Sequence, residues 1–379
     1  MYLYLIKKWH KMNQDKLFKE QLKNNNVIIN EYINEYNDHL ILVHYNIFSK
    51  DLYKNLNSIY REARSLVIDL NTEEIVLCPF KKFFNINELP ETNLNLIQEQ
   101  IKNADLVEFS EKLDGSMQHA RWYKDHLILA GSTTLNKDNS YQLKEGYALF
   151  KDNYIQLCKD YVDYTFIFEA ILEDDHHIVN YNMDYLYLIG ARNVYTGKTL
   201  SYTDIKFLGL KYNIDTPIIS HITLDTCLKT QSLYTATEKE GWVIYIRKDD
   251  QEYRYKLKCD QYLQLHKLIN QVNSFKVIKQ LLQEEKIDDF ISKLPENIRI
   301  VVNDKVNKLK QYCFDLNSKI NKYYQSIPYT ENDKQFALFV QEYIPKDYYK
   351  YMYMKRKNKK INVLKDITEE KLNQFININ

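Results

Sequence analysis

The 379-residue chain contains little glycine and little proline, with 7 and 6 residues respectively. Average usage of roughly 7% would give about 27 glycines. Neither the GxxxxGKS/T pattern nor GxGxxG occurs, which excludes a glycine-rich phosphate cradle of the Walker or dinucleotide-binding kind. The same scarcity excludes collagen-like and Gly/Ser-linker architectures.

Cysteines are also few and scattered. The chain has five, without a CxxC pair, and this pattern favours a reducing compartment over a disulfide framework. No run approaches the roughly 18 apolar residues that a membrane span needs, and the apolar start of the chain covers only about six positions. We therefore expect a soluble cytoplasmic protein without a membrane partner (the host cytoplasm if the protein is encoded by a virus or phage).

The charges nearly cancel, because 52 Lys and Arg face 51 Asp and Glu, leaving a net charge of +1. A globally basic, histone-like binder is therefore excluded, whereas a local basic groove is compatible with this balance. At roughly 150 residues per domain, the length predicts two domains or three.

The first two thirds of the chain mix short β-branched runs with helical patterns. Helices are predicted near 141–160 and 202–212, and apolar spacing over the polar stretch 14–36 predicts another helix. Strands are predicted at 40–45, 66–69, 74–77, 106–109, 117–123, 126–129, 165–169, 185–189 and 242–246. This irregular alternation indicates an α+β fold with mainly antiparallel sheets.

Beyond about residue 262 the apolar residues recur at three and four positions, which predicts an all-helical second domain. The expected domains are 1–265 and 266–379, with further helices over 286–326, 330–343 and 366–376. The Tyr343-Ile-Pro345 break and the basic run 355–360 predict turns between the last helices.

The densest chemical motif is Glu111-Lys112-Leu113-Asp114-Gly115. A lysine between carboxylates, with a scarce glycine behind it, is typical of a nucleophilic lysine at the end of a strand. The alternative is a hairpin in which an Asp-Gly turn follows a surface lysine.

Two further blocks carry charge on predicted strands. Lys256 and Lys258 share one face of a strand, where two ammonium groups repel each other unless an anion lies between them. Glu240-Gly241 precedes this strand, and Glu169 interrupts an apolar strand, where an unpaired carboxylate is costly to bury. The alternative for the two lysines is a solvated edge strand, and the alternative for Glu169 is a side chain that reaches solvent.

Upstream of these blocks, Arg64 opens a strand, and Lys82 stands beside Phe83 and Phe84. The two aromatic rings suit either base stacking or core packing.

These blocks follow one another in a fixed order. Gaps of 57, 71 and 16 residues separate Lys112, Glu169, Glu240 and Lys256. The order resembles the covalent nucleotidyltransferases, which comprise ATP-dependent ligases and capping enzymes. Short segments of the sequence are similar to the RNA ligase 1 family typified by the bacteriophage T4 enzyme. These segments are Tyr45-Asn, Lys82-Phe-Phe-Asn-Ile-Asn-Glu88, Ile178-Val-Asn-Tyr181 and Tyr262-x-x-Leu265-His266. The resemblance covers roughly residues 40–290 and implies a nucleotidyltransferase (ATP-grasp-like ligase) domain.

The resemblance implies a reaction in three steps. Lys112 attacks the α-phosphorus of ATP to form lysyl–AMP, AMP passes to an RNA 5′-phosphate, and an RNA 3′-hydroxyl then displaces AMP. Lys256, Lys258 and Arg64 are the implied catalytic cations around the phosphates. We expect the neighbouring cations to favour the neutral amine of Lys112 and the carboxylates to oppose it.

The remaining site residues also follow from the resemblance. The nucleotide is expected to contact Tyr45, Lys82, Glu111, Asp114, Gly115, Glu169 and Glu240. Mg²⁺ or Mn²⁺ would use Glu240 and Asp288, although Asp288 equally fits a solvated helix start.

The chain departs from the family pattern at two positions, because Ser132 stands where a basic residue is usual and Ser65 where glycine is usual. We expect ordinary structural roles for His119 and His126. The segment 348–360 interleaves tyrosines and basic residues, which suits either RNA tracking or a tyrosine-rich helix followed by a solvated charge run.

The leading hypothesis is an ATP-dependent RNA ligase acting on single-stranded RNA ends or a nicked tRNA loop, alongside a separate end-healing kinase or phosphatase. A DNA ligase or guanylyltransferase would continue into a small β-barrel after Lys258, whereas this chain continues with a helical pattern. A non-catalytic RNA-binding module is the alternative outside the enzymes.

Overall fold

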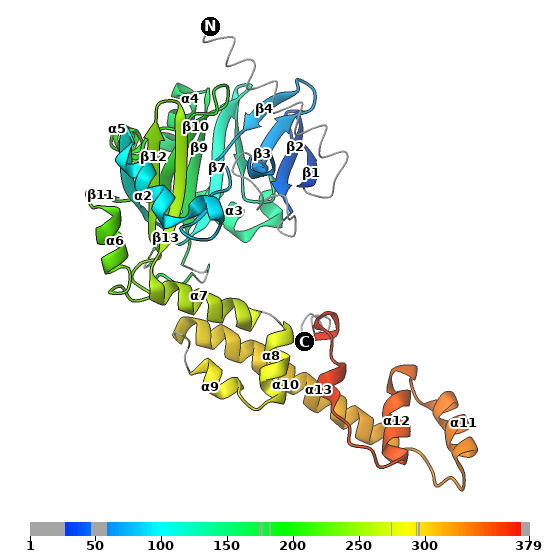
Figure 1. Cartoon of the computed structure of the whole chain (residues 1–379). Helices are drawn as coiled ribbons and strands as arrows, with labels where there is room; N and C mark the ends of the chain where they lie inside the picture. Colours follow the sequence, from blue (N-terminus) through cyan, green and yellow to red (C-terminus); the bar gives the residue numbers. More distant parts are fainter. Residues whose placement is uncertain are drawn as a thin grey trace. The chain divides into compact units, whose positions relative to one another are not determined.

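A computed structural model describes residues 27–46 and 59–372, apart from positions 174, 176, 182, 274, 293 and 295. The chain divides into two compact units, Met1–Gln264 and Leu265–Asn379. The first contains three sheets with helices and the second is helical (Figure 1). The predicted α+β architecture with mainly antiparallel sheets and a helical C-terminal part is therefore confirmed. Within the described part of the chain, every helix is too short or too polar to cross a membrane.

The first sheet has the order β1-β2-β3-β4, and its neighbouring strands all pair antiparallel. Its strands are β1 (Val27–Ile33), β2 (His39–Tyr45), β3 (Arg64–Asp69) and β4 (Glu74–Leu77). The helix predicted over 14–36 is wrong for its described part, because residues 27–33 form β1, and residues 14–26 lie outside the described residues. The β-branched start of β1 suits an extended strand, and β2 pairs with all seven of its residues.

The second sheet has the order β10-β9-β7-β8. Its strands are β7 (Ser116–Tyr123), β8 (His126–Ala130), β9 (Tyr164–Ile171) and β10 (Tyr185–Asn193). Helices α3 (Tyr141–Leu149), α4 (Asp152–Asp160) and α5 (Tyr202–Tyr212) lie where helices were predicted. Their side chains Leu143, Leu157 and Ile205 share a core with Phe166 and Phe168 of β9, so the helices support this sheet.

The third sheet has the order β11-β6-β12-β13-β5 and carries most of the charged motifs. Its strands are β5 (Phe84–Asn85), β6 (Leu106–Lys112), β11 (Ile219–Ser220), β12 (Gly241–Lys248) and β13 (Gln251–Lys258). All pairs are antiparallel except β13–β5. Helices α2 (Leu94–Lys102) and α6 (Leu224–Thr230) complete the first unit.

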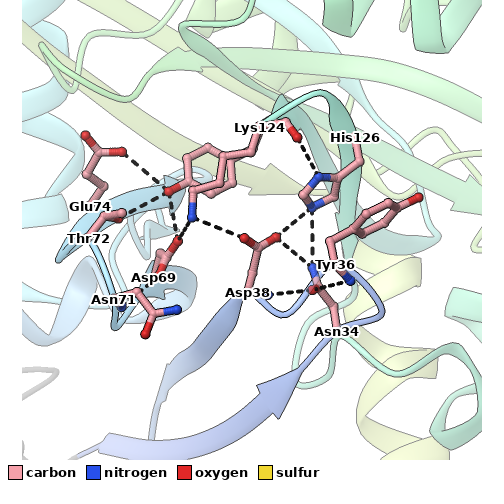
Figure 2. Close-up of polar contacts among 10 residues, drawn as sticks. Asn34, Tyr36, Asp38, Asp69, Asn71, Thr72, Glu74, Lys124 and His126 are labelled. Carbon is pink, nitrogen blue, oxygen red and sulfur yellow. Dashed lines mark hydrogen bonds and ion pairs between the residues drawn. The ribbon is translucent and has the colours of Figure 1, made fainter.

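An ionic network joins three hairpin turns of the first unit (Figure 2). The ammonium of Lys124, in the β7–β8 turn, lies 3.1 Å from Asp38 in the β1–β2 turn and 2.6 Å from Asp69 at the end of β3. His126 Nε2 lies 2.7 Å from Asp38, and the Tyr123 hydroxyl donates to Asp69. The network therefore links the first sheet to the second and gives His126 a structural role.

The second unit consists of short helices around one long helix. Helix α7 (Asp260–Asn273) leads into α8 (Phe275–Gln283), α9 (Ile287–Ile291), α10 (Glu296–Gln325), α11 (Asp333–Tyr343), α12 (Tyr349–Arg356) and α13 (Val363–Asp366). The helix predicted over 366–376 is partly wrong, because α13 ends at Asp366, residues 369–372 form another helical turn, and positions 373–376 lie outside the described residues. Tyr351 and Met352 of α12 are buried, whereas residues 357–360 are exposed. The tyrosine-rich segment is thus a core helix followed by a charged turn.

Candidate active site

Three neighbouring strands of the third sheet bring the charged motifs together. Lys112 is the last residue of β6, Gly241 of β12 lies directly opposite it, and Lys258 of β13 lies on the other side of Gly241. Glu240 is only 3% exposed and reaches both lysines. Its Oε2 lies 2.7 Å from Lys112 Nζ and its Oε1 lies 2.9 Å from Lys258 Nζ. One carboxylate therefore holds two ammonium groups from separate strands.

A cavity of about 310 Å³ opens above these strands, a volume within the usual range for small-ligand sites. Among its lining residues are Arg64, Glu111, Lys112, Gly115, Ser132, Glu169 and Lys256. The structure thus gathers residues from all three sheets around one space, although they are far apart in the sequence.

Lys256 is the least compensated cation of the cavity. It shares a strand face with Lys258, as the two-residue spacing predicts, and no carboxylate lies within ion-pair distance of it among the described residues. Its Nζ lies 4.7 Å from the centroid of the Phe83 ring, and Arg64 Cζ lies 5.3 Å from the same centroid. Burial, and then the charges of Arg64 and Lys112, hold the pKa of Lys256 well below its usual value. This position favours an anionic ligand.

Nearby carboxylates control the protonation of Lys112. Burial alone lowers the pKa of Lys112, but the carboxylates of Glu240, Glu169 and Asp114 together outweigh burial and raise it. The carboxylates, which were expected to oppose the neutral amine, therefore dominate, and Glu240 contributes most through its 2.7 Å contact with Lys112 Nζ. Lys112 is an ammonium group that must lose a proton before it can act as a nucleophile.

Glu169, on β9, faces the same space. The Gly115 N–H donates to its Oε1 at 3.2 Å. Burial raises the pKa of Glu169 to about 7; the charge of Glu240 adds to this, while Lys112 and Arg64 act in the opposite direction. A Cβ on Gly115 would lie 2.6 Å from the Ala170 carbonyl oxygen, so glycine lets this turn approach β9.

Asp114 is oriented by protein groups. Its Oδ2 accepts from the backbone N–H groups of Ile178 and Val179 at 2.9 and 3.1 Å, and its Oδ1 accepts from the Tyr262 hydroxyl at 2.8 Å. The Asp114 N–H donates to the Tyr181 hydroxyl at 3.0 Å. Asp114 therefore fixes the turn behind Lys112. The sequence analysis did not predict Tyr181 and Tyr262 as site residues, although both lie in the short segments that resemble the family.

Other predicted residues line the cavity or stand beside it. Arg64 opens β3 and has a buried Nη1 without a hydrogen-bond partner among the described atoms. Lys82 donates from Nζ to the Tyr45 hydroxyl at 3.3 Å, and the charge of Lys82 also lowers the pKa of Lys256. These residues form a cationic side of the site.

The carboxylates limit where a divalent ion could bind. Asp288 lies in the first turn of α9 in the second unit and is exposed. In the described ranges, no group of three or more His, Cys, Asp and Glu side chains is arranged to hold a metal. Glu240 and Glu169 lie close enough for Glu240 to raise the pKa of Glu169. Two carboxylates fit Mg²⁺, which usually takes its remaining ligands from phosphates and water.

Comparison with known proteins gives consistent matches. A model of the RNA ligase family matches residues 62–263. A protein of Autographa californica nuclear polyhedrosis virus, named as a bifunctional polynucleotide kinase/RNA ligase, is 24% identical in an alignment 283 residues long. The alignment covers 69% of this chain and 39% of the viral protein. An RNA ligase of Thermovibrio ammonificans is 29% identical over 147 residues, covering 37% of this chain and 36% of that protein. The chain thus spans less than two thirds of either curated relative.

Solved structures of ligases also align with this chain, and the alignment with a TM-score of 0.50 shows the same fold. An archaeal ATP-dependent RNA ligase aligns with a TM-score of 0.50 at 12% identity, covering 86% of this chain and 85% of that one. An ATP-dependent DNA ligase from Aquifex aeolicus gives 0.49 at 16% identity, with 82% and 80% covered. A Naegleria gruberi RNA ligase variant with ATP and Mn gives 0.36 at 18% identity, with 46% and 56% covered.

Proposed function

The chain belongs to the RNA ligase family of the T4 RNA ligase 1 type, and we propose that it is an ATP-dependent ligase joining RNA 5′-phosphate and 3′-hydroxyl ends. The observation that carries the proposal is the position of Lys112. Its amine lies at a nucleotide-sized cavity and is held by Glu240, which also holds Lys258. A solvated hairpin lysine would have none of these features.

In the first step, Lys112 Nζ loses its proton and attacks the α-phosphorus of ATP. The new N–P bond gives lysyl–AMP, and the bond to pyrophosphate breaks. Lys256, Lys258 and Arg64 stabilise the negative charge that develops on the phosphates, and they do so most strongly away from bulk water. Their placement around Lys112 supports this assignment.

The ammonium of Lys112 must first be released from Glu240. Glu240 and Glu169 would hold a divalent ion (Mg²⁺ or Mn²⁺), and when bound this ion supplies positive charge against the phosphates and the carboxylates. A positive charge beside Glu240 would offset part of the carboxylate influence that raises the pKa of Lys112. Asp288 stays a proposed further carboxylate from the second unit.

Two transfers complete the reaction. The RNA 5′-phosphate attacks lysyl–AMP, which gives an AMP-capped RNA and frees Lys112. An RNA 3′-hydroxyl then attacks the capped end, forming the phosphodiester bond and releasing AMP. Unit Met1–Gln264 is our proposed adenylyltransferase domain, because all the residues named for these steps except Asp288 lie within it.

The biological partners are also proposals. We propose that the substrates are single-stranded RNA ends or a nicked tRNA loop, repaired in the cytoplasm, where the free cysteines suit a reducing environment. The viral relative is named as a bifunctional polynucleotide kinase/RNA ligase, which supports a kinase activity that prepares the ends. For this chain we propose that a separate kinase or phosphatase prepares them.

The test is covalent labelling. Purified protein is incubated with α-labelled ATP and Mg²⁺, denatured and examined for bound label, with Lys112→Ala alongside. We expect a labelled band from ATP that the variant lacks. Label from GTP and not ATP would indicate a guanylyltransferase, and no label from either nucleotide would leave a non-catalytic RNA-binding module.

A further inference from the structure

A second cavity of about 500 Å³ adjoins the nucleotide cavity in the first unit. Three chain segments form its walls: Phe80–Phe84, the turn Thr196–Thr199, and Asp250 with the first part of β13 as far as Tyr255. Phe80 and Phe83 line both cavities, so this pair of rings is a shared wall. The second cavity is larger than the first, and no step proposed above uses it.

The lining of the second cavity is rich in positive charge. Its six cationic residues, against two acidic ones, are Arg61, Lys81, Lys82, Arg192, Lys198 and Arg254. Buried pairs with Glu91 and Glu62 neutralise Arg61 and Arg192. No carboxylate lies within ion-pair distance of Lys82 and Arg254 among the residues that the structure describes. An excess of positive charge therefore stays available inside the cavity.

Aromatic rings accompany these cations. Arg254 Cζ lies 4.3 Å from the centroid of the Phe80 ring, and the Arg254 Nε is buried without a hydrogen-bond partner among the described atoms. Phe84 and Tyr253 also line the space. Flat rings beside cations suit a ligand that has both an aromatic base and a phosphate.

The edge of the third sheet leaves this space open. Strand β5 pairs only with Tyr255 and Lys256 of β13, so residues 251–254 have no strand partner on that side among the described strands. The rim lysines Lys81 and Lys198 are 57% and 47% exposed and pair with Glu62 and Asp250. Glu62 is only 10% exposed, whereas Asp250 is 88% exposed. A pair exposed on both sides, such as Lys198–Asp250, is worth about 0–1 kcal/mol, so a phosphate can replace Asp250 at little cost.

We propose that the second cavity binds the RNA strand that receives AMP, by the nucleotide next to its 5′-phosphate. This proposal rests on the proposed ligase function, because the RNA 5′-phosphate must reach the phosphorus held at Lys112 while AMP fills the first cavity. Lys82 lines the second cavity and acts electrostatically on Lys256 in the first, so a phosphate chain passing between the cavities would stay among cations.

The test separates RNA binding from nucleotide chemistry. The double variant Lys81→Gln/Lys198→Gln is compared with Lys248→Gln, an exposed lysine on the same β12–β13 hairpin that does not line the cavity. Binding of a 5′-phosphorylated single-stranded RNA is measured between 50 and 200 mM salt, and labelling by α-labelled ATP is followed in parallel.

We expect the double variant to bind the RNA roughly 3–10-fold more weakly. Its slope of log K against log salt should be shallower by about 1.4, which corresponds to two lost phosphate contacts at about 0.7 each. Labelling by ATP and the behaviour of Lys248→Gln should match the wild type. A misfolded variant would instead lose labelling as well as binding.

Two results would overturn the proposal. An unchanged affinity and salt slope would show that RNA does not occupy the cavity. Slower labelling with unchanged RNA binding would assign the cavity to the triphosphate tail of ATP. If the wild type is never labelled but RNA binding responds as expected, the ligase function fails while the RNA site stands.

Discussion

At the scale of single residues, the site is a balance between a few charges that lie close together. Glu240 shares its carboxylate between Lys112 and Lys258, and this lowers its own pKa even though burial opposes ionisation. Lys256 has no such carboxylate partner among the described residues, and the pKa of Lys256 is lowered. The site therefore holds Lys112 in the protonated form and favours an anion at Lys256.

Glu169 should make the stability of the ligand-free protein depend on pH. Its folded pKa is about 7, above the ordinary value of 4.5, so the folded state keeps a proton that the unfolded state loses between these values. Stability therefore falls as pH rises through this window. Glu169→Gln cannot ionise, and its melting temperature should exceed the wild-type value at pH 8 by about 2–4 °C, the shift that 1 kcal/mol produces at this size.

The comparison is made by thermal unfolding with EDTA and without nucleotide. At pH 5 the difference should be smaller, because most of the range from 4.5 to about 7 lies above that pH. A constant difference between pH 5 and pH 8 would contradict the raised pKa. Gln keeps an oxygen that can accept from Gly115 N–H, so the variant tests the charge and not the hydrogen bond.

Gly241 is required for the register that brings the lysines together. A Cβ at this position would lie 2.0 Å from the Leu257 carbonyl oxygen, and φ is +150°, where side chains are strained. Gly241→Ala must therefore shift β13, and we expect it to cost about 1–3 kcal/mol and to reduce labelling by ATP at least tenfold.

Gly131→Ala is the matched control, because its Cβ would meet Leu143 Cβ at an ordinary 3.6 Å. Labelling is measured at a temperature where both variants are folded by circular dichroism. Equal labelling by the two alanine variants would show that the space at Gly241 does not matter.

At the scale of secondary-structure elements, a bulge in β3 orients the Arg64 side chain toward the cavity that it lines. Arg64 and Leu66 pair with His44 and Val43 of β2, so Ser65 between them has no partner on β2. Ser65 has φ 62°, the left-handed conformation in which glycine carries no penalty. Its hydroxyl donates to the Ser132 carbonyl oxygen at 2.5 Å. The two departures from the family pattern therefore contact each other at the cavity wall.

The Ser65 hydroxyl and the Ser65 Cβ should have separable effects. Ser65→Gly and Ser65→Ala both lose the bond to the 131–134 loop, so both should raise the ATP concentration for half-maximal labelling, roughly 3–10-fold. Only glycine removes the left-handed strain of about 1–2 kcal/mol. Ser65→Gly should therefore melt about 2–4 °C above Ser65→Ala for each 1 kcal/mol of strain relieved.

Asn213→Gly is the control for this pair, because Asn213 is a left-handed helix cap with φ 53° that does not line the cavity. It should leave the ATP dependence unchanged. The contrary result would be a half-maximal ATP concentration that differs between Ser65→Gly and Ser65→Ala in step with their melting temperatures. Ser65 would then affect ATP binding through the stability of the fold and not through its hydroxyl.

How far the sequence predicts this site depends on whether the signal is local. Side chains alternate between the two faces of a strand, and this local rule correctly predicts that Lys256 and Lys258 share one face of β13. The spacing of apolar residues in Val27–Ile33 also fits a helix, and only pairing with β2 makes this segment a strand. The Tyr262 hydroxyl reaches Asp114 from 148 residues away, so no short window contains that contact.

At the scale of the whole molecule, the first unit depends on contacts that tie its sheets together. The cavity is lined from all three sheets, because Arg64 comes from β3, Glu169 from β9 and Lys112 from β6. The ionic network of Figure 2 joins the first two of these sheets through Lys124. Its residues do not line the nucleotide cavity, so the network should stabilise the unit without taking part in chemistry.

Asp69→Asn should test this separation of stability from activity. Asp69 is fully buried and accepts from Lys124, Tyr123 and the Asn71 N–H, so losing its charge should cost about 1–3 kcal/mol at pH 7. Its pKa is lowered, chiefly by the hydrogen bond from Lys124 acting against burial. The stabilisation is therefore present above the ordinary value of 3.8 and is lost as pH falls below it.

Thermal unfolding of Asp69→Asn should show a lower melting temperature than the wild type at pH 7 and a smaller difference near pH 3. Asp125→Asn, an exposed aspartate in the turn that carries Lys124, should match the wild type at both pH values. Labelling by ATP at 20 °C should be unchanged in both variants. A loss of labelling in folded Asp69→Asn would mean that the network sets the position of Arg64 through β3, and that the two sheets act as one support for the site.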